Sequence, residues 1–117
     1  MNYDKAHELA KSMRDSEEYK ALQSAQVAVE NDETAKGLIE TFISLQMQVD
    51  YARMAQAPEE SELMKKLEDV MPMIHANSGA QNYLQAYVRW TQVTNDIYRI
   101  ISEPIAEGMK ILEKPKS

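Results

Sequence analysis

The chain has 117 residues, a formal net charge of −6 and no cysteine, and it contains only three glycines and four prolines. This length fits a single domain, and the scarcity of chain-breaking residues disfavours turn-rich all-β folds and favours helices. The absence of cysteine excludes disulfides, Cys₂His₂ zinc sites, thiolate-bound iron–sulfur clusters and cysteine nucleophiles, and the acidic balance is unfavourable for nucleic-acid binding.

Apolar side chains recur at helical spacing in the first half of the chain and predict three helices. The first helix has one short apolar face, made by Ala6, Leu9, Ala10 and Met13. Asp15, with Glu18 three residues later, fits a capping box that would begin the second helix, and Asp32 can cap the third. The third helix carries a heptad-like seam whose steps alternate between three and four residues: Ala35, Leu38, Phe42, Leu45, Val49 and Ala52.

Two further long helical patterns follow. Pro58 suits the first position of a fourth helix, because its missing amide proton would have no partner there. Pro72 lies inside this pattern and predicts a kink or an early stop near Met71. Asn77 or Ser78 can cap a fifth helix, which has the longest apolar pattern of the chain.

The last part of the chain is predicted from one proline and from its composition. Pro104 disfavours helical backbone at Glu103, so we expect a break there and a short sixth helix after it. Residues 1–112 would then form a single all-helical domain, and residues 113–117 would form a frayed C-terminal tail.

The fifth helix carries more apolar surface than one neighbouring helix can cover, because its polar positions form only a narrow stripe. From Ala80 to Ser102 it would be about 34 Å long, and the third helix has a similar apolar surplus. We therefore expect an elongated helical bundle with two long antiparallel helices plus shorter helices, and we expect it to dimerise. The candidate residues for an interface with a second copy or another protein are Phe42, Leu45, Val49, Met54, Tyr83, Tyr87, Trp90, Ile97 and Ile101.

The residues that could carry chemistry form no catalytic or metal-binding pattern. His7 and His75 are far apart in the sequence, and neither belongs to a Glu-x-x-His or His-x-x-x-His pair. Acidic residues after Pro58 suit the positive end of a helix, and Asp50 and Asp96 are each followed three residues later by arginine, which predicts solvated pairs. We predict no catalytic residue, no cofactor and no metal ion.

Methionines concentrate on the third and fourth helices, at Met47, Met54, Met64, Met71 and Met73. They are either core residues or part of an adaptable surface that binds a protein partner, since thioether side chains are flexible. Tyr83, Tyr87 and Trp90 are likewise either packing residues or exposed anchors for a partner.

The sequence also indicates where the protein resides. Residues 1–15 contain charges throughout and no apolar signal-peptide core, and no apolar run approaches the roughly 20 residues that span a bilayer. We expect a cytoplasmic protein without membrane insertion and without direct contact to nucleic acid.

Several short stretches, taken in order, resemble one known family. They are Ala6-His7-Glu8-Leu9, Ser16-Glu17-Glu18-Tyr19, Asp32 with Ala35, Leu38 and Phe42, then Leu45-Gln46, Asn77, Tyr83-Leu84 with Ala86, and Ile101 with Glu103-Pro104-Ile105. The combination, which covers about residues 3–112, resembles the bacterial YlbF/YmcA/YheA family of small all-helical proteins.

The resemblance implies long antiparallel helices, a dimer or higher assembly, and no catalytic site. It implies a regulatory role, because the YlbF and YmcA branches support competence, sporulation and biofilm formation, partly by directing the membrane-bound ribonuclease RNase Y. Those branches hold an iron–sulfur cluster with cysteines, whereas this cysteine-free chain resembles the YheA-type branch. We therefore expect a non-enzymatic adaptor or regulator. The alternative is a helical bundle that binds a small apolar ligand in a pocket lined by methionine and tyrosine.

Overall fold

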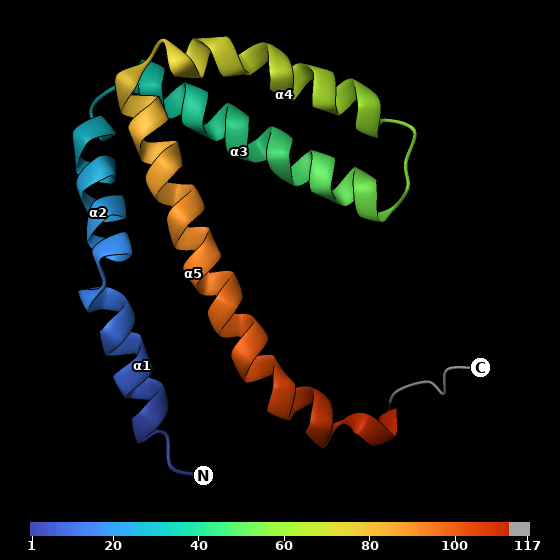
Figure 1. The fold of residues 1–117 in the computed structure, drawn as a ribbon. Coiled ribbons are helices and arrows are strands. Elements are labelled where there is room, and N and C mark those ends of the chain that lie inside the picture. The colour runs from blue at the N-terminus through green and yellow to red at the C-terminus, as the bar shows by residue number, and fades with distance from the viewer. Residues whose placement is uncertain (113–117) are drawn as a thin grey trace.

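The computed structural model describes residues 1–112, which form helices and no strand (Figure 1). The five α-helices are α1 (Asp4–Asp15), α2 (Glu17–Val29), α3 (Glu33–Met54), α4 (Glu60–His75) and α5 (Ser78–Gly108), followed by a short 3₁₀-helix, η1 (Lys110–Leu112). The predictions of an all-α fold and of five main helices are confirmed. The tail predicted at residues 113–117 lies outside the described residues.

Side-chain caps begin three of the helices. Ser16, Asp32 and Asn77 each accept a hydrogen bond from the backbone N–H three residues further on, at 3.2, 3.0 and 2.9 Å. The cap predicted at Asp32 is confirmed, and of the two alternatives for α5, Asn77 or Ser78, the cap is Asn77. The capping box predicted at Asp15 is wrong, because Asp15 still belongs to α1 and the extended residue Ser16 both ends α1 and caps α2.

Pro104 does not break the fifth helix, so the break predicted at Glu103 is wrong, and the short sixth helical element begins only at Lys110. Helix α5 continues through Pro104 to Gly108, and η1 begins only after it. A proline inside a helix removes the hydrogen bond to the carbonyl four residues earlier, here that of Ile100. Ile100 is 61% exposed, so water can satisfy its carbonyl and the helix tolerates the proline.

Pro58 and Pro72 also have other effects on the helices than the sequence predicted. Pro72 lies inside α4, which runs on to His75, so the early stop predicted near Met71 is wrong. Pro58 lies in the turn before α4 rather than at its first position, since Glu59 is the N-cap residue.

The helices form two arms that meet at one corner (Figure 1). Helix α2 packs along the first part of α5, helix α3 packs on α4, and both α3 and α4 reach α5 near its start. The Cα radius of gyration is 18.4 Å and the molecule measures 50 × 41 × 15 Å. A compact chain of this length would have a radius of gyration of about 13 Å, so the molecule is flat and open.

The core follows the corner and the α3–α4 pair. Its buried residues are Val29, Ala35, Ile39, Val49, Leu67, Val70, Ile74, Ala80 and Leu84. Gly79 allows the close approach of α5 to α2, because a Cβ atom at this position would lie 3.0 Å from Cγ1 of Val29. Gly79 and the fully buried Ala80 thus lie at the start of α5, where it meets α2.

The turn after α3 contains the one non-glycine residue with positive φ among the described residues, Gln56 at φ 52°. The N–H of Ala57 donates to the carbonyl of Ala52 at 2.8 Å, and that of Gln56 donates to the carbonyl of Arg53 at 3.2 Å. These two bonds define a Schellman motif, whose left-handed position favours glycine. Gln56 therefore holds a strained backbone that directs the chain towards α4.

We predict that Gln56→Gly stabilises the protein, because glycine adopts the left-handed conformation without steric cost. The free energy of unfolding in urea should rise by about 0.5–1 kcal/mol. The control is Gln26→Gly in the middle of α2, where glycine should lower the free energy of unfolding by a similar amount. A fall in stability for Gln56→Gly would contradict the assigned strain.

Candidate interaction surfaces

The predicted interface residues do not lie on one surface. Val49 has no exposed area and is the largest side chain that is fully buried, so it belongs to the core and cannot contact a partner. Phe42, Leu45 and Tyr83 are half-buried and pack against the core. The heptad-like seam of the third helix is therefore covered mainly by the chain's own α4. Of the residues predicted on this helix, only Met54 is exposed.

The three aromatic residues predicted at the interface on α5, Tyr83, Tyr87 and Trp90, pack within the chain. The ring of Trp90 lies 5.3 Å from that of Tyr19 on α2, with the ring planes inclined at 59°. Tyr83 and Tyr87 stack at 6.3 Å. All three predicted aromatic residues are half-buried, which favours their interpretation as packing residues.

The second half of α5 has an uncovered apolar face. Every residue from Tyr98 to Gly108 is exposed. We call four isoleucines the distal α5 face: Ile97, Ile100, Ile101 and Ile105. Ile97 is half-buried, and the other three are 61%, 43% and 57% exposed, in that order. This face contains both of the predicted interface residues in this part of the helix.

A second apolar surface lies at the far end of α3, on the other arm. Met47, Tyr51 and Met54 are 66%, 77% and 86% exposed, and their spacing of four and three residues places them on one side of the helix. We call these three residues the hairpin stripe. Beside it is a depression of about 380 Å³. Tyr51 was missed in the prediction, although its spacing between the two methionines was a readable signal.

The methionines divide between the two predicted roles. Met47, Met54 and Met73 are exposed, whereas Met64 and Met71 are half-buried and pack against the core. Exposed methionines are suited to adaptable contacts, because their side chains are unbranched and flexible.

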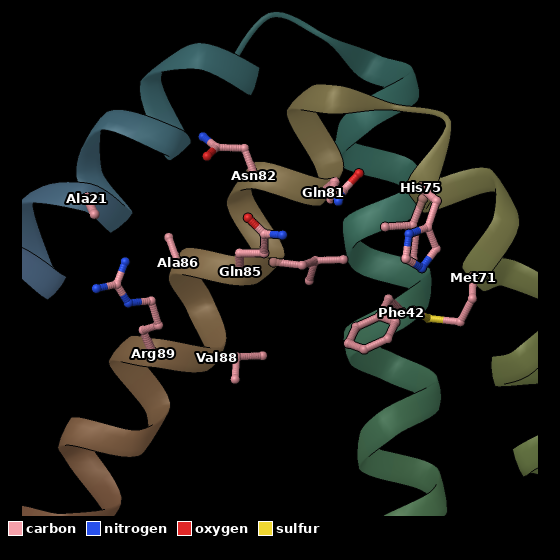
Figure 2. Close-up of a pocket in the computed structure, with 12 residues that line it drawn as sticks. Ala21, Phe42, Met71, His75, Gln81, Asn82, Gln85, Ala86, Val88 and Arg89 are labelled. Carbon is pink, nitrogen blue, oxygen red and sulfur yellow. The ribbon is translucent and has the colours of Figure 1, made fainter.

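A groove of about 540 Å³ lies over the corner, between α2, α5 and the α3–α4 pair (Figure 2). Phe42, Met71 and His75 line it on one side, and Arg89 and Ala86 of α5 line it towards α2 (Figure 2). We call it the corner groove. Its walls are mostly apolar, with amide side chains and Arg89 among them.

Charged groups are at the surface in the part of the chain that the structure describes, and no polar or charged residue is buried there. The predicted Asp96–Arg99 pair is confirmed at 3.5 Å. The pair predicted between Asp50 and Arg53 is wrong, because Nε of Arg53 lies 3.5 Å from Glu60 and joins α3 to α4. Asp50 instead accepts a hydrogen bond from Gln46.

Residues 1–112 contain neither a side-chain group suited to a metal ion nor a helix suited to cross a bilayer. No group of three or more histidine and acidic side chains is arranged so that it could hold a metal ion. None of the described helices combines the length and the apolar character that a bilayer-spanning segment needs.

Comparison with known proteins identifies the family. The family model described as "Control of competence regulator ComK, YlbF/YmcA" matches residues 2–106. The chain belongs to this family. The resemblance inferred from the short sequence stretches is thereby confirmed.

The sequence relatives belong to the YheA-type branch and are named UPF0342 proteins. One from Alkalihalophilus pseudofirmus is 33% identical over 105 residues, which cover 90% of this chain and 89% of the relative. One from Clostridium novyi is 33% identical and covers 88% of this chain and 90% of the relative. The crystal structure of Bacillus subtilis RicA in complex with RicF has a similar fold, with a TM-score of 0.51, 18% identity, and coverage of 90% of this chain and 93% of that one.

The packing of Trp90 predicts a fluorescence response. Tyr19→Ala removes the ring against Trp90, so the emission of the chain's one tryptophan should shift to the red and become more accessible to iodide. The free energy of unfolding should fall by about 1–2 kcal/mol, because an aromatic contact and its buried area are lost. The exposed Tyr51→Ala should change neither spectrum nor stability, and an unchanged spectrum for Tyr19→Ala would contradict the contact.

Proposed function

We propose that this protein is a non-enzymatic adaptor or regulatory subunit that works by binding proteins through exposed apolar helix faces. The observation that carries the proposal is the presence of two such faces on separate arms of one chain. They are the distal α5 face and the hairpin stripe, whose large apolar side chains are mostly uncovered. Exposed apolar patches on a folded chain mark interaction sites.

The two surfaces suit two different contacts. We propose that one of them joins two copies into a homodimer and that the other binds a different protein. The family description, control of the competence regulator ComK, supports a regulatory role. The structural neighbour RicA was solved with a protein partner, RicF, which supports a role in protein assemblies.

The iron–sulfur cluster of the YlbF and YmcA branches does not fit these residues. Such clusters are held by cysteine thiolates, and this chain has no cysteine. The proposed function therefore assigns no cofactor and relies on surface contacts alone. We propose that the protein acts in the cytoplasm, as its sequence leads us to expect.

We predict that Tyr51→Asp abolishes binding of the protein partner. A carboxylate in the middle of the hairpin stripe would be buried without a counter-charge on binding, at a cost of several kcal/mol. The measurement is quantitative mass spectrometry of proteins that co-purify with the tagged protein from its own bacterium. Proteins that are retained by wild type and by Thr41→Asp, an exposed position elsewhere on α3, but lost with Tyr51→Asp are the partners.

Two results would count against the adaptor proposal. One is the absence of any protein that wild type retains reproducibly. The other is a turnover of a small molecule by the purified protein. Equal capture by both aspartate variants would show that binding uses another surface.

The corner groove supports a second candidate, the binding of a small apolar ligand. Its volume of about 540 Å³ falls within the 300–1,000 Å³ that is typical of ligand sites. A ligand that binds there should raise the unfolding temperature of wild type and not of Val88→Asp, which places a charge on the groove wall. A screen of apolar acids, quinones and isoprenoids in which no compound stabilises wild type would exclude those classes.

A further inference from the structure

Helix α1 has an apolar face that its own chain covers only in part, since Ala10 and Met13 are half-buried while Ala6 and Leu9 are exposed. The face consists of Ala6, Leu9, Ala10 and Met13. No residue of this 12-residue helix is buried, and among the described elements α1 contacts only its neighbour α2. An isolated helix of this length is at best marginally stable in water, so α1 needs a partner for its apolar face.

The distal α5 face lies on the side of α5 that should receive such a partner. Helices α2 and α5 run antiparallel, with Val29 beside Gly79 and Tyr19 beside Trp90. Along α5, Trp90 is followed by Ile97 and Ile101 after seven and four residues, so all three lie on the same side. The surface that packs on α2 therefore continues past the end of α2 as the distal α5 face.

If α1 continued the line of α2, it would lie along this face, at about residues 94–105. The extended residue Ser16, with φ −71° and ψ 152°, redirects the chain between the two helices. Figure 1 shows α1 and the second half of α5 separating towards the chain ends. The two apolar faces thus flank a space that the chain leaves open, and we call this part of the molecule the leg.

We propose that the leg is the self-association surface, and that a second copy of this chain covers it with its own leg. The inference rests on the homodimer proposed above and adds the face that forms it. In a two-fold dimer, the apolar face of α1 from one copy would enter the open space beside α5 of the other copy, and the reverse. The leg is therefore complementary to itself, as a two-fold interface requires. The two α1 and two α5 helices would then share one core, as in a four-helix bundle.

The area available is large enough for this contact. The chain exposes 9306 Å². A compact monomer of its 13.4 kDa mass exposes roughly 6,500 Å², and a standard interface buries about 800 Å² on each partner. One dimer interface therefore fits within the excess and leaves the hairpin stripe free for another protein.

The charges of the leg also permit the contact. Each chain carries a net charge of −6, which opposes association of two copies in general. Helix α1 contains three acidic and three basic residues, so its own contribution is zero: Asp4, Glu8 and Asp15 against Lys5, Lys11 and Arg14. The second half of α5 has a net charge of −2, from Asp96, Glu103 and Glu107 against Arg99, so the larger part of the acidic excess lies outside the leg.

The decisive variant is Ile101→Asp, compared with Tyr51→Asp on the other arm. Ile101 is 43% exposed in the single chain, so its replacement leaves the core intact. Sedimentation equilibrium should show a dimer for wild type and for Tyr51→Asp. For Ile101→Asp the dissociation constant should rise at least about 100-fold, since a charge enters the apolar interface.

Hydrogen exchange of α1 tests the same contact by an independent readout. The α1 amides should be protected in the wild-type dimer and should lose protection in Ile101→Asp, whereas the α4 amides should be unchanged and so show that the chain is folded. Unprotected α1 amides in the dimer would overturn the inference.

The remaining outcomes separate this inference from the proposed function. A wild-type dimer that persists in Ile101→Asp, or that dissociates in Tyr51→Asp, would overturn the assignment of the leg and leave the homodimer standing. A wild-type monomer at all accessible concentrations would overturn the homodimer and the leg together, while the binding of a different protein through the hairpin stripe would still be open to its own test.

Discussion

The fold depends on the close approach of four helices at one corner, and short side chains make this approach possible. Ala25, Ala35 and Ala80 are 1%, 0% and 0% exposed, and Gly79 lies against Val29. Short side chains bring helix axes together, but each buries little apolar area, and the hydrophobic gain scales with that area. The corner therefore fixes the directions of the helices through short side chains, and larger buried side chains fill the space around them: Val29, Ile39, Ile74 and Leu84.

The two arms extend from this corner because the helices diverge beyond it (Figure 1). Away from the corner, α3 is covered by α4 along one side, whereas α1 and the second half of α5 have no such cover. The hairpin stripe and the distal α5 face lie on different arms, and each is far from the corner. Sites that are well separated and share no contacts act independently, so occupation of one arm need not disturb the other. A chain of this shape can join a copy of itself to a different protein.

Helical spacing was enough to predict the elements, because the period of apolar residues depends only on local geometry. It was not enough to predict which helix covers which face. Val49 and Ile101 both lie in apolar rows with steps of three and four residues, yet Val49 is buried under α4 and Ile101 is exposed. The difference arises from the directions that the helices take at the corner, and these depend on contacts between residues far apart in the sequence.

The same limit explains the errors at the prolines. The cost of a proline inside a helix depends on whether the carbonyl that loses its partner can reach water. Ile100 is exposed, so α5 passes through Pro104 without a break. Exposure is a property of the fold, and the local sequence around Pro104 does not contain it.

The side chains of the two surfaces differ in a way that matches the two proposed contacts. The distal α5 face consists of isoleucine, whose branched Cβ restricts its rotamers, so that little conformational entropy is lost on burial. The hairpin stripe contains two methionines, which lose more entropy but adapt to surfaces of different shape. Stiff side chains suit an interface that always meets an identical copy, because one fitted geometry is sufficient. Flexible side chains suit an interface that must accommodate a partner whose surface is not a replica of its own.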